Sequence, residues 1–162
     1  MKCVILAGGY GTRISEESNL KPKPMIEIGG KPMLWHIMNL YASYKHKDFF
    51  VALGYKGEII KNYFSNISEK WNLNLIDTGQ KTMTGGRVKR LKDFIGDETF
   101  MVTYADGLAN VDVNALLEFH RGHGKLATVT TVPPPSRFGN LEIDNGKVIS
   151  FNEKPEENEG LI

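Results

Sequence analysis

The chain has 162 residues, a length typical of one domain, with ordinary shares of apolar and charged residues. Its 20 basic and 19 acidic side chains nearly cancel, and the net charge of +1 argues against a nucleic-acid-coating protein. A single cysteine, Cys3, excludes an intrachain disulfide. The first apolar run is too short for a signal peptide or a membrane span, so we expect a cytoplasmic protein that does not act at a membrane.

Apolar runs alternate with helical patterns along the chain. Buried strands are expected over 3–6, 48–53, 73–76 and 100–104, with a short strand over 25–28. Helices are expected over 32–44, 57–64, 87–94 and 111–120. A β-rich stretch covers 127–132, and strands over 139–143 and 148–151 form a hairpin around Asn145-Gly146.

This alternation predicts an α/β fold with a Rossmann-like, doubly wound and mostly parallel sheet. In such sheets, ligands bind beyond the carboxyl ends of the strands. The candidate chemical residues of this sequence follow strands, at the first glycine loop, at Asp77 and at Asp106.

The first expected strand runs into the loop Ala7-Gly8-Gly9-Tyr10-Gly11-Thr12-Arg13. Glycines lack Cβ and tolerate positive φ, so backbone N–H groups can close around an anion, and Arg13 adds a guanidinium suited to phosphate. No Gly-Lys-Ser/Thr follows Gly11, which excludes a P-loop, and Ile14 stands where the dinucleotide fingerprint needs glycine. The alternative is a tight turn with a solvated arginine.

A second motif, Lys21-Pro22-Lys23-Pro24-Met25, follows at a short distance. The two prolines stiffen the backbone around Lys23 and help to aim its ammonium at a phosphate. Together, the glycine loop and this motif resemble the sugar-1-phosphate nucleotidyltransferases. The resemblance implies the nucleotide-diphospho-sugar transferase fold, with residues 1–162 as a nucleotidyltransferase domain. It also implies that Lys23 supports the sugar phosphate and the reacting centre.

Asp106 lies in Tyr104-Ala105-Asp106-Gly107, at the tip of an expected buried strand. A carboxylate there is a good ligand for Mg²⁺, which would bridge triphosphate oxygens. The family commonly has glycine before this aspartate, so Ala105 departs slightly from its pattern. The alternative for Asp106 is an Asx-turn that only ends the strand.

Asp77-Thr78-Gly79, followed by Thr84-Gly85-Gly86-Arg87, resembles the cytidylyltransferase subgroup of this family. The resemblance assigns base and ribose contacts to Thr84, Gly85 and Gly86, which we expect to form a Gly-Gly turn. It implies CTP as nucleotide donor and α-D-glucose 1-phosphate as acceptor. Arg87 fits a different pattern, because with Lys89, Arg90 and Lys92 it forms a charged helix face of the kind that is usually solvated.

Glu153-Lys154-Pro155 also resembles a family motif. There the glutamate accepts hydrogen bonds from sugar hydroxyls and the lysine holds the sugar phosphate. Gly139, after Arg137-Phe138, is similar to the glycine that packs under the sugar ring. Taken alone, Glu153 and Lys154 would be an exposed ion pair of little energetic value.

The resemblance therefore predicts a set of sites for CTP or another nucleoside triphosphate, a sugar 1-phosphate and Mg²⁺. The catalytic candidates are Arg13, Lys23 and Asp106, with Asp106 also the metal ligand. The nucleotide-binding candidates are Leu6, Ala7, Gly8, Gly9, Gly11, Thr12, Arg13, Lys23, Thr84, Gly85, Gly86, Tyr104, Ala105 and Asp106. The sugar-binding candidates are Gly139, Glu153 and Lys154.

Several alternatives remain open at this point. The same scaffold could use another nucleotide or acceptor, or the chain could be a non-catalytic regulatory protein that binds nucleotide sugars, and a homo-oligomer is not excluded. The sequence ends at Ile162, where the family continues, so we expect the C-terminal part of the sugar-binding region and a second metal-binding aspartate to lie outside these residues. The connection between Phe64 and Leu73 is shorter than in the cytidylyltransferases.

Overall fold

The computed structural model describes residues 1–10, 21–132 and 140–152. The chain divides into two units, Met1–Leu116 and Leu117–Ile162, which are described separately. None of the helices in these described ranges is long and apolar enough to cross a membrane.

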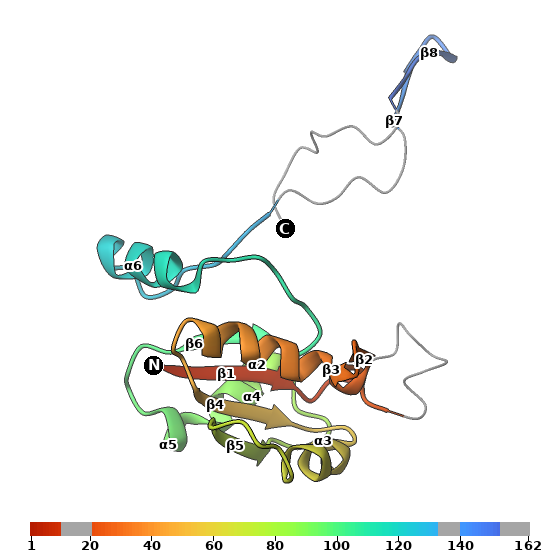
Figure 1. Cartoon of the computed structure of the whole chain (residues 1–162). Coiled ribbons are helices and arrows are strands. Elements are labelled where there is room, and N and C mark those ends of the chain that lie inside the picture. The colour runs from red at the N-terminus through yellow and green to blue at the C-terminus, as the bar shows by residue number, and fades with distance from the viewer. Residues whose placement is uncertain (11–20, 133–139, 153–162) are drawn as a thin grey trace. The chain divides into compact units, whose positions relative to one another are not determined.

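The first unit is built on a sheet whose strands are all parallel. They lie in the order β5-β4-β1-β6 (Figure 1). Their bounds are β1 Lys2–Ala7, β4 Asp48–Leu53, β5 Asn72–Asp77 and β6 Met101–Tyr104. Strands that run in the same direction end at the same edge of the sheet, so the loops that follow them are neighbours. The register sets Leu6 beside both Ala52 and Tyr104.

Helices cover both faces of this sheet, because alternate strand residues point to opposite sides. Cys3, Ile5 and Ala7 belong to one buried cluster, which also takes in apolar residues of the helices α2 (Met33–Ser43) and α3 (Gly57–Phe64). Val4 and Leu6 belong to the cluster on the opposite face. This cluster includes Leu91, which lies between the helices α4 (Thr84–Arg90) and α5 (Lys92–Ile95), and Ile95 at the end of α5. The doubly wound α/β architecture predicted from the sequence is confirmed.

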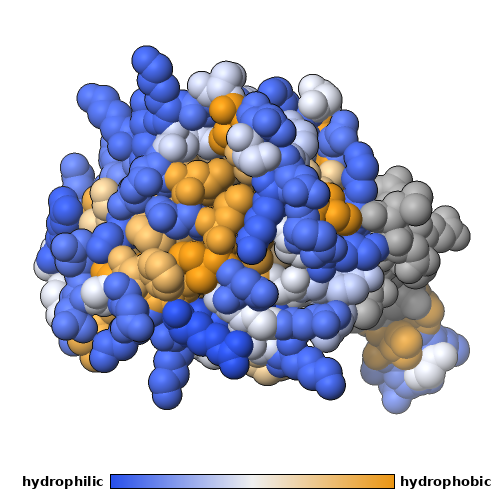
Figure 2. Space-filling model, turned by 90° about the horizontal axis from the view of Figure 1, so that it is seen from below, coloured by the Kyte–Doolittle hydropathy of each residue, from blue (hydrophilic) through white to orange (hydrophobic). Residues whose placement is uncertain are grey.

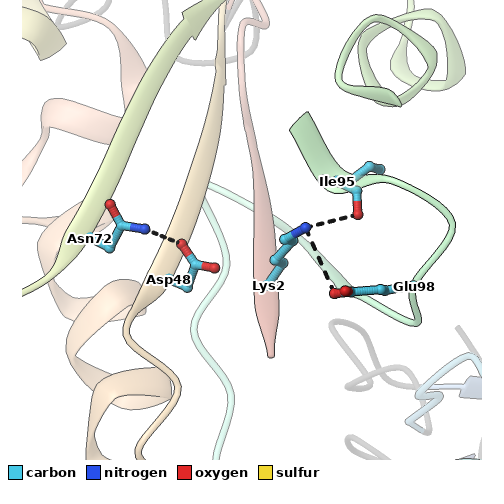
Figure 3. A network of polar contacts seen from close by, with 5 residues as sticks. All are labelled: Lys2, Asp48, Asn72, Ile95 and Glu98. Carbon is cyan, nitrogen blue, oxygen red and sulfur yellow. Dashed lines mark hydrogen bonds and ion pairs between the residues drawn. The ribbon is translucent and has the colours of Figure 1, made fainter. Parts of the chain in front are cut away.

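Polar contacts surround the amino ends of β1, β4 and β5 (Figure 3). The Nζ of Lys2 lies 3.1 Å from the carbonyl oxygen of Ile95 and 3.7 Å from a carboxylate oxygen of Glu98. The side chain of Asn72 donates to Asp48 across 2.7 Å, which ties β5 to β4. Figure 2 views the molecule from the side where β5, α3 and α5 lie, and shows apolar side chains gathered within a hydrophilic border.

The helix α6 (Val113–His123) begins in the first unit and continues into the second. The second unit also holds the antiparallel strands β7 (Asn140–Asp144) and β8 (Lys147–Asn152). Asn145 and Gly146 between them have φ values of 47° and 77°. Two successive positive φ values are typical of a type I′ turn, so the predicted hairpin is confirmed.

Four expectations about elements need correction. Residues 25–28 are not one strand: Lys23–Met25 form the 3-10 helix η1, and only β2 (Glu27–Ile28) pairs, with β3 (Lys31–Pro32). Pro24 explains this, because its fixed φ suits a helical turn and it has no N–H to donate. The stretch 127–132 forms no strand, and Val129 and Val132 are exposed. Residues that favour strands form a strand only where a neighbouring strand is available to pair with them.

The helix expected over 87–94 is also wrong in its bounds. Thr84, Gly85 and Gly86 are the first turn of α4 and not a separate turn before it. The helix is interrupted at Leu91, whose φ and ψ are −90° and 0°, and α5 continues from Lys92. Leu91 is fully buried against the sheet, so the helix is interrupted at a residue whose side chain packs into the core.

Candidate active site

The carboxyl ends of the strands bring several predicted residues to one edge of the sheet. β1 ends in Ala7 and is followed by Gly8, while β6 ends in Tyr104 and is followed by Ala105 and Asp106. The N–H of Ala105 donates to the carbonyl of Leu6 across 3.2 Å, which extends the pairing of the two strands to the last residue before Asp106. The Tyr104 side chain is exposed and Ala105 is buried.

Lys23 and Asp106 meet at this edge, as the prediction that both act in one site requires. The Nζ of Lys23 lies 2.8 Å from Oδ2 of Asp106. Both side chains keep access to solvent, with exposed fractions of 27% and 42%. Pro22 and Pro24 are buried on either side of Lys23, so the backbone that carries the ammonium is anchored in the core. An accessible cation and anion at a strand end can both bind a charged ligand.

Lys21, two residues earlier, makes a different contact. Its Nζ lies 2.7 Å from a carboxylate oxygen of Glu27, and both side chains are about half exposed. Lys21 therefore fits the interpretation of a surface lysine in a proline-rich turn.

The glycine loop shows which of its predicted residues can offer side chains to a ligand. Leu6 and Ala7 are buried, so they can contribute only backbone groups. Gly8 is buried and Gly9 is exposed, and neither has φ in the left-handed region. A Cβ on Gly9 would meet no atom of the described residues within 4 Å. Gly11, Thr12 and Arg13 lie outside the described residues.

The predicted base-binding segment opens α4. Thr84 and Gly85 are exposed, and no atom of residues 1–10, 21–132 or 140–152 lies within 4 Å of a Cβ built on Gly85. In the preceding loop, the N–H of Gly79 donates to Oδ1 of Asp77 across 2.8 Å. Gly139, Glu153 and Lys154, predicted to bind the sugar, lie outside the described residues.

Arg87 was expected on a solvated helix face, and this expectation is wrong. Its side chain is buried, with 5% of its surface exposed, and it donates hydrogen bonds to the carbonyl oxygens of Gly8 and Leu53. The sequence does hold a signal for this burial. Arg87 precedes the buried Leu91 by four residues, so the two share one face of a helix.

Comparison with known proteins identifies the family to which the chain belongs. The model of the nucleotidyl transferase family matches residues 2–161. The chain is 49% identical to glucose-1-phosphate cytidylyltransferase of Salmonella typhi and 43% identical to a probable glucose-1-phosphate cytidylyltransferase of Bacillus subtilis. Each alignment covers 100% of this chain and 72% of the relative.

A solved structure gives the same result for the fold. HddC from Yersinia pseudotuberculosis, in a complex with GMP-PN, is 29% identical and superimposes with a TM-score of 0.72. The match covers 99% of this chain and 72% of HddC. The chain therefore belongs to the nucleotidyl transferase family, and it is a nucleotidyltransferase similar to the glucose-1-phosphate cytidylyltransferases.

Proposed function

We propose that this protein transfers a cytidylyl group from CTP to α-D-glucose 1-phosphate, which forms CDP-glucose and releases pyrophosphate. The observation that carries the proposal is the 2.8 Å contact of Lys23 with Asp106, at the edge where β1 enters its glycine loop. The choice of CTP and glucose 1-phosphate is supported by the names of the relatives at 49% and 43% identity.

The chemistry of this reaction determines which groups the site must supply. A phosphate oxygen of the sugar phosphate forms a bond to the α-phosphorus of the triphosphate, and the bond to the departing pyrophosphate breaks. Both reactants are polyanions, so much of the barrier comes from their mutual repulsion and from the need to align them. Fixed cations and amide dipoles that hold the phosphates in place lower both contributions.

The residues then divide these tasks among them. Lys23 neutralises charge on the reacting phosphates, and the two buried prolines beside it limit the reorganisation needed to do so. Backbone groups of the glycine loop, with Arg13, hold the β- and γ-phosphates. Lys154 holds the phosphate of the sugar. The roles of Arg13 and Lys154 rest on the family motifs alone.

Asp106 is the proposed ligand of Mg²⁺. Its carboxylate is a hard oxygen donor, and it is accessible at the end of a strand. Among the described residues, no group of three or more His, Cys, Asp or Glu side chains could hold a metal by itself. This fits Mg²⁺, which commonly binds through one or two carboxylates together with substrate phosphates and water. The bound ion would neutralise phosphate charge during the transfer.

The first turn of α4 is the proposed contact for the base. Cytosine and uracil differ at C4, where cytosine has an amino donor and uracil a carbonyl acceptor. None of the described residues crowds Gly85, so a planar base can approach its backbone closely enough for hydrogen bonds to distinguish the two groups.

A comparison of nucleotides tests the proposal. Pyrophosphate release would be measured with glucose 1-phosphate and Mg²⁺ in the presence of CTP, UTP, dTTP or GTP, and each reaction repeated without the sugar phosphate. We expect kcat/KM for CTP to exceed the others by about tenfold or more, equivalent to about 1.4 kcal/mol. Preference for another nucleotide would contradict the choice of CTP. Binding of CTP without release of pyrophosphate would instead indicate a regulatory protein.

A further inference from the structure

The Arg87 side chain joins three neighbouring strands of the sheet at their carboxyl ends. Its Nη1 donates to the carbonyl of Leu53, the last residue of β4, across 2.9 Å, and to the hydroxyl of Thr78, directly after β5, across 2.7 Å. Its Nη2 donates to the carbonyl of Gly8, directly after β1, across 2.8 Å. A planar guanidinium with several donors can make these bonds together, whereas a lysine ammonium on its flexible stem is a single point charge.

The sequence leaves room for this guanidinium at two glycines. A Cβ on Gly8 or on Gly54 would lie within contact distance of the Arg87 guanidinium. At Gly8 the absence of a side chain therefore serves the packing of Arg87, since the φ of this residue lies outside the left-handed region. The buried Arg87 side chain of α4 therefore packs against the residues that follow β1 and β4, and both of these residues are glycines.

The bond to Gly8 also sets the direction of the next amide. No cis peptide bond occurs among the described residues, so the carbonyl of Gly8 and the N–H of Gly9 point in opposite directions within their peptide plane. Because Arg87 holds the carbonyl, the N–H of Gly9 is turned away from the guanidinium. Gly9 is exposed, and among the described residues no atom lies within 4 Å of a Cβ built on it, so an anion can approach this part of the loop.

The positive charge of Arg87 also lies next to the glycine loop. Burial lowers the pKa of the guanidinium, while the charge of Asp77 acts in the opposite direction. An arginine nevertheless keeps its proton inside a protein, because its ordinary pKa is very high. Its hydrogen-bond acceptors among the described residues are neutral carbonyls and a hydroxyl, so the charge is offset only by the Asp77 carboxylate, which makes no direct hydrogen bond to it, and the guanidinium can attract an anion bound at the adjacent loop.

We infer that Arg87 is a positioning residue for the nucleotide: by holding the Gly8 carbonyl to the ends of β4 and β5, it aims the Gly9 N–H at the triphosphate. This inference rests on the proposed function, because it takes the glycine loop as the triphosphate site. Arg87 is not itself a catalytic residue, since the guanidinium is buried.

The test uses the full chain with two substitutions that alter the buried bonds. Arg87→Lys keeps the positive charge but loses the planar guanidinium that donates to several acceptors at once. Thr78→Val removes the hydroxyl that accepts from Nη1 of Arg87 and itself donates to the carbonyl of Leu53, and Thr78 is fully buried, so any effect on the nucleotide must pass through the protein. The matched control is Arg90→Lys. Arg90 lies on the same helix, and its Nη1 donates to the carbonyl of Thr78 across 2.6 Å. For each variant one measures Kd for CTP, KM and kcat, the melting temperature, and the NMR shift of the Gly9 amide without ligand.

We expect Arg87→Lys to raise Kd and KM for CTP about tenfold, to shift the Gly9 amide resonance, and to leave KM for glucose 1-phosphate unchanged. Thr78→Val should change the same quantities in the same direction by a smaller factor, and Arg90→Lys should leave them within about twofold of wild type. A lower melting temperature with unchanged CTP affinity and an unchanged Gly9 resonance would overturn the inference, because Arg87 would then only stabilise the fold. Should Arg87→Lys fail to fold, the same outcomes for Thr78→Val decide.

The outcome for the proposed function is separate. If the wild-type chain binds no CTP, the proposed function fails, whereas the effect of each substitution on the Gly9 amide still shows whether Arg87 orients the loop.

Discussion

The ammonium of Lys23 and the carboxylate of Asp106 lie 2.8 Å apart, although 83 residues separate them in the sequence. Lys23 contacts Oδ2 of Asp106, and a divalent cation bound to the same carboxylate would lie close to this ammonium and be repelled by it. Lys23 and the metal therefore compete for Asp106, and release of Lys23 by the metal would free its ammonium for phosphate.

This competition predicts that removal of the lysine strengthens metal binding while it weakens catalysis. In the absence of nucleotide, Lys23→Met should bind Mn²⁺ about two- to fivefold more tightly, as expected from the loss of a partly exposed ion pair of up to about 1 kcal/mol. Electron paramagnetic resonance of free Mn²⁺ measures this directly. Asp106→Asn should lose the binding, and Lys21→Met should leave it unchanged. Weaker Mn²⁺ binding by Lys23→Met would show that the two do not compete.

Cys3 predicts a dependence of stability on alkaline pH. Burial raises the pKa of its thiol from 9.0 to about 12. Between these values the unfolded chain has lost the proton that the folded chain retains, so the free energy of unfolding falls as pH rises through this window. Urea unfolding at pH 8 and at pH 10.5 should show a smaller loss of stability for Cys3→Ala than for wild type. Equal losses in both proteins would mean that other groups account for the pH dependence.

The buried cluster beneath α2 predicts a large effect from one truncation. Leu34 is fully buried between this helix and the sheet, so Leu34→Ala removes apolar contacts and leaves a cavity. We expect a loss of about 2–5 kcal/mol in the free energy of unfolding, measured in urea. The control Met83→Ala removes a side chain that is 81% exposed and should change stability by less than about 0.5 kcal/mol.

The two glycines that follow β1 should differ in their tolerance of a methyl group. A Cβ on Gly8 would overlap the Arg87 guanidinium, so Gly8→Ala should destabilise the fold by about 1–3 kcal/mol. A Cβ on Gly9 meets no atom within 4 Å in the part of the chain that the structure describes, so Gly9→Ala should have little effect on thermal unfolding. Equal stability of the two variants would contradict the packing described for Arg87.

Much of the fold could be predicted from the sequence, because the strands that form the centre of the sheet are short continuous apolar runs. The bounds expected for the strand at 48–53 and for the helix at 57–64 agree with the structure. Gly54 and Tyr55 between them supply a clear turn signal. The hairpin at Asn145-Gly146 was predictable for the same reason, since its turn chemistry is local.

The errors arose where tertiary contacts outweigh local patterns. Arg87 has the charge of a surface residue, yet it is buried by hydrogen bonds to three strand ends that no local pattern displays. The stretch 127–132 has strand composition, but composition does not supply a pairing partner. The pairing of Lys23 with Asp106 was predictable only as a meeting at one sheet edge, and the direct contact between them required the structure.

The most direct measurement of the central claim is the rate of pyrophosphate release from CTP and glucose 1-phosphate by Lys23→Ala, compared with Lys21→Ala. Lys21 is a matched control, because it lies two residues away and pairs with Glu27 on the surface. If Lys23 holds the reacting phosphates, Lys23→Ala should lose about 100-fold or more in kcat with its melting temperature retained, and Lys21→Ala should stay within about twofold of wild type. An undiminished rate for Lys23→Ala would contradict the account.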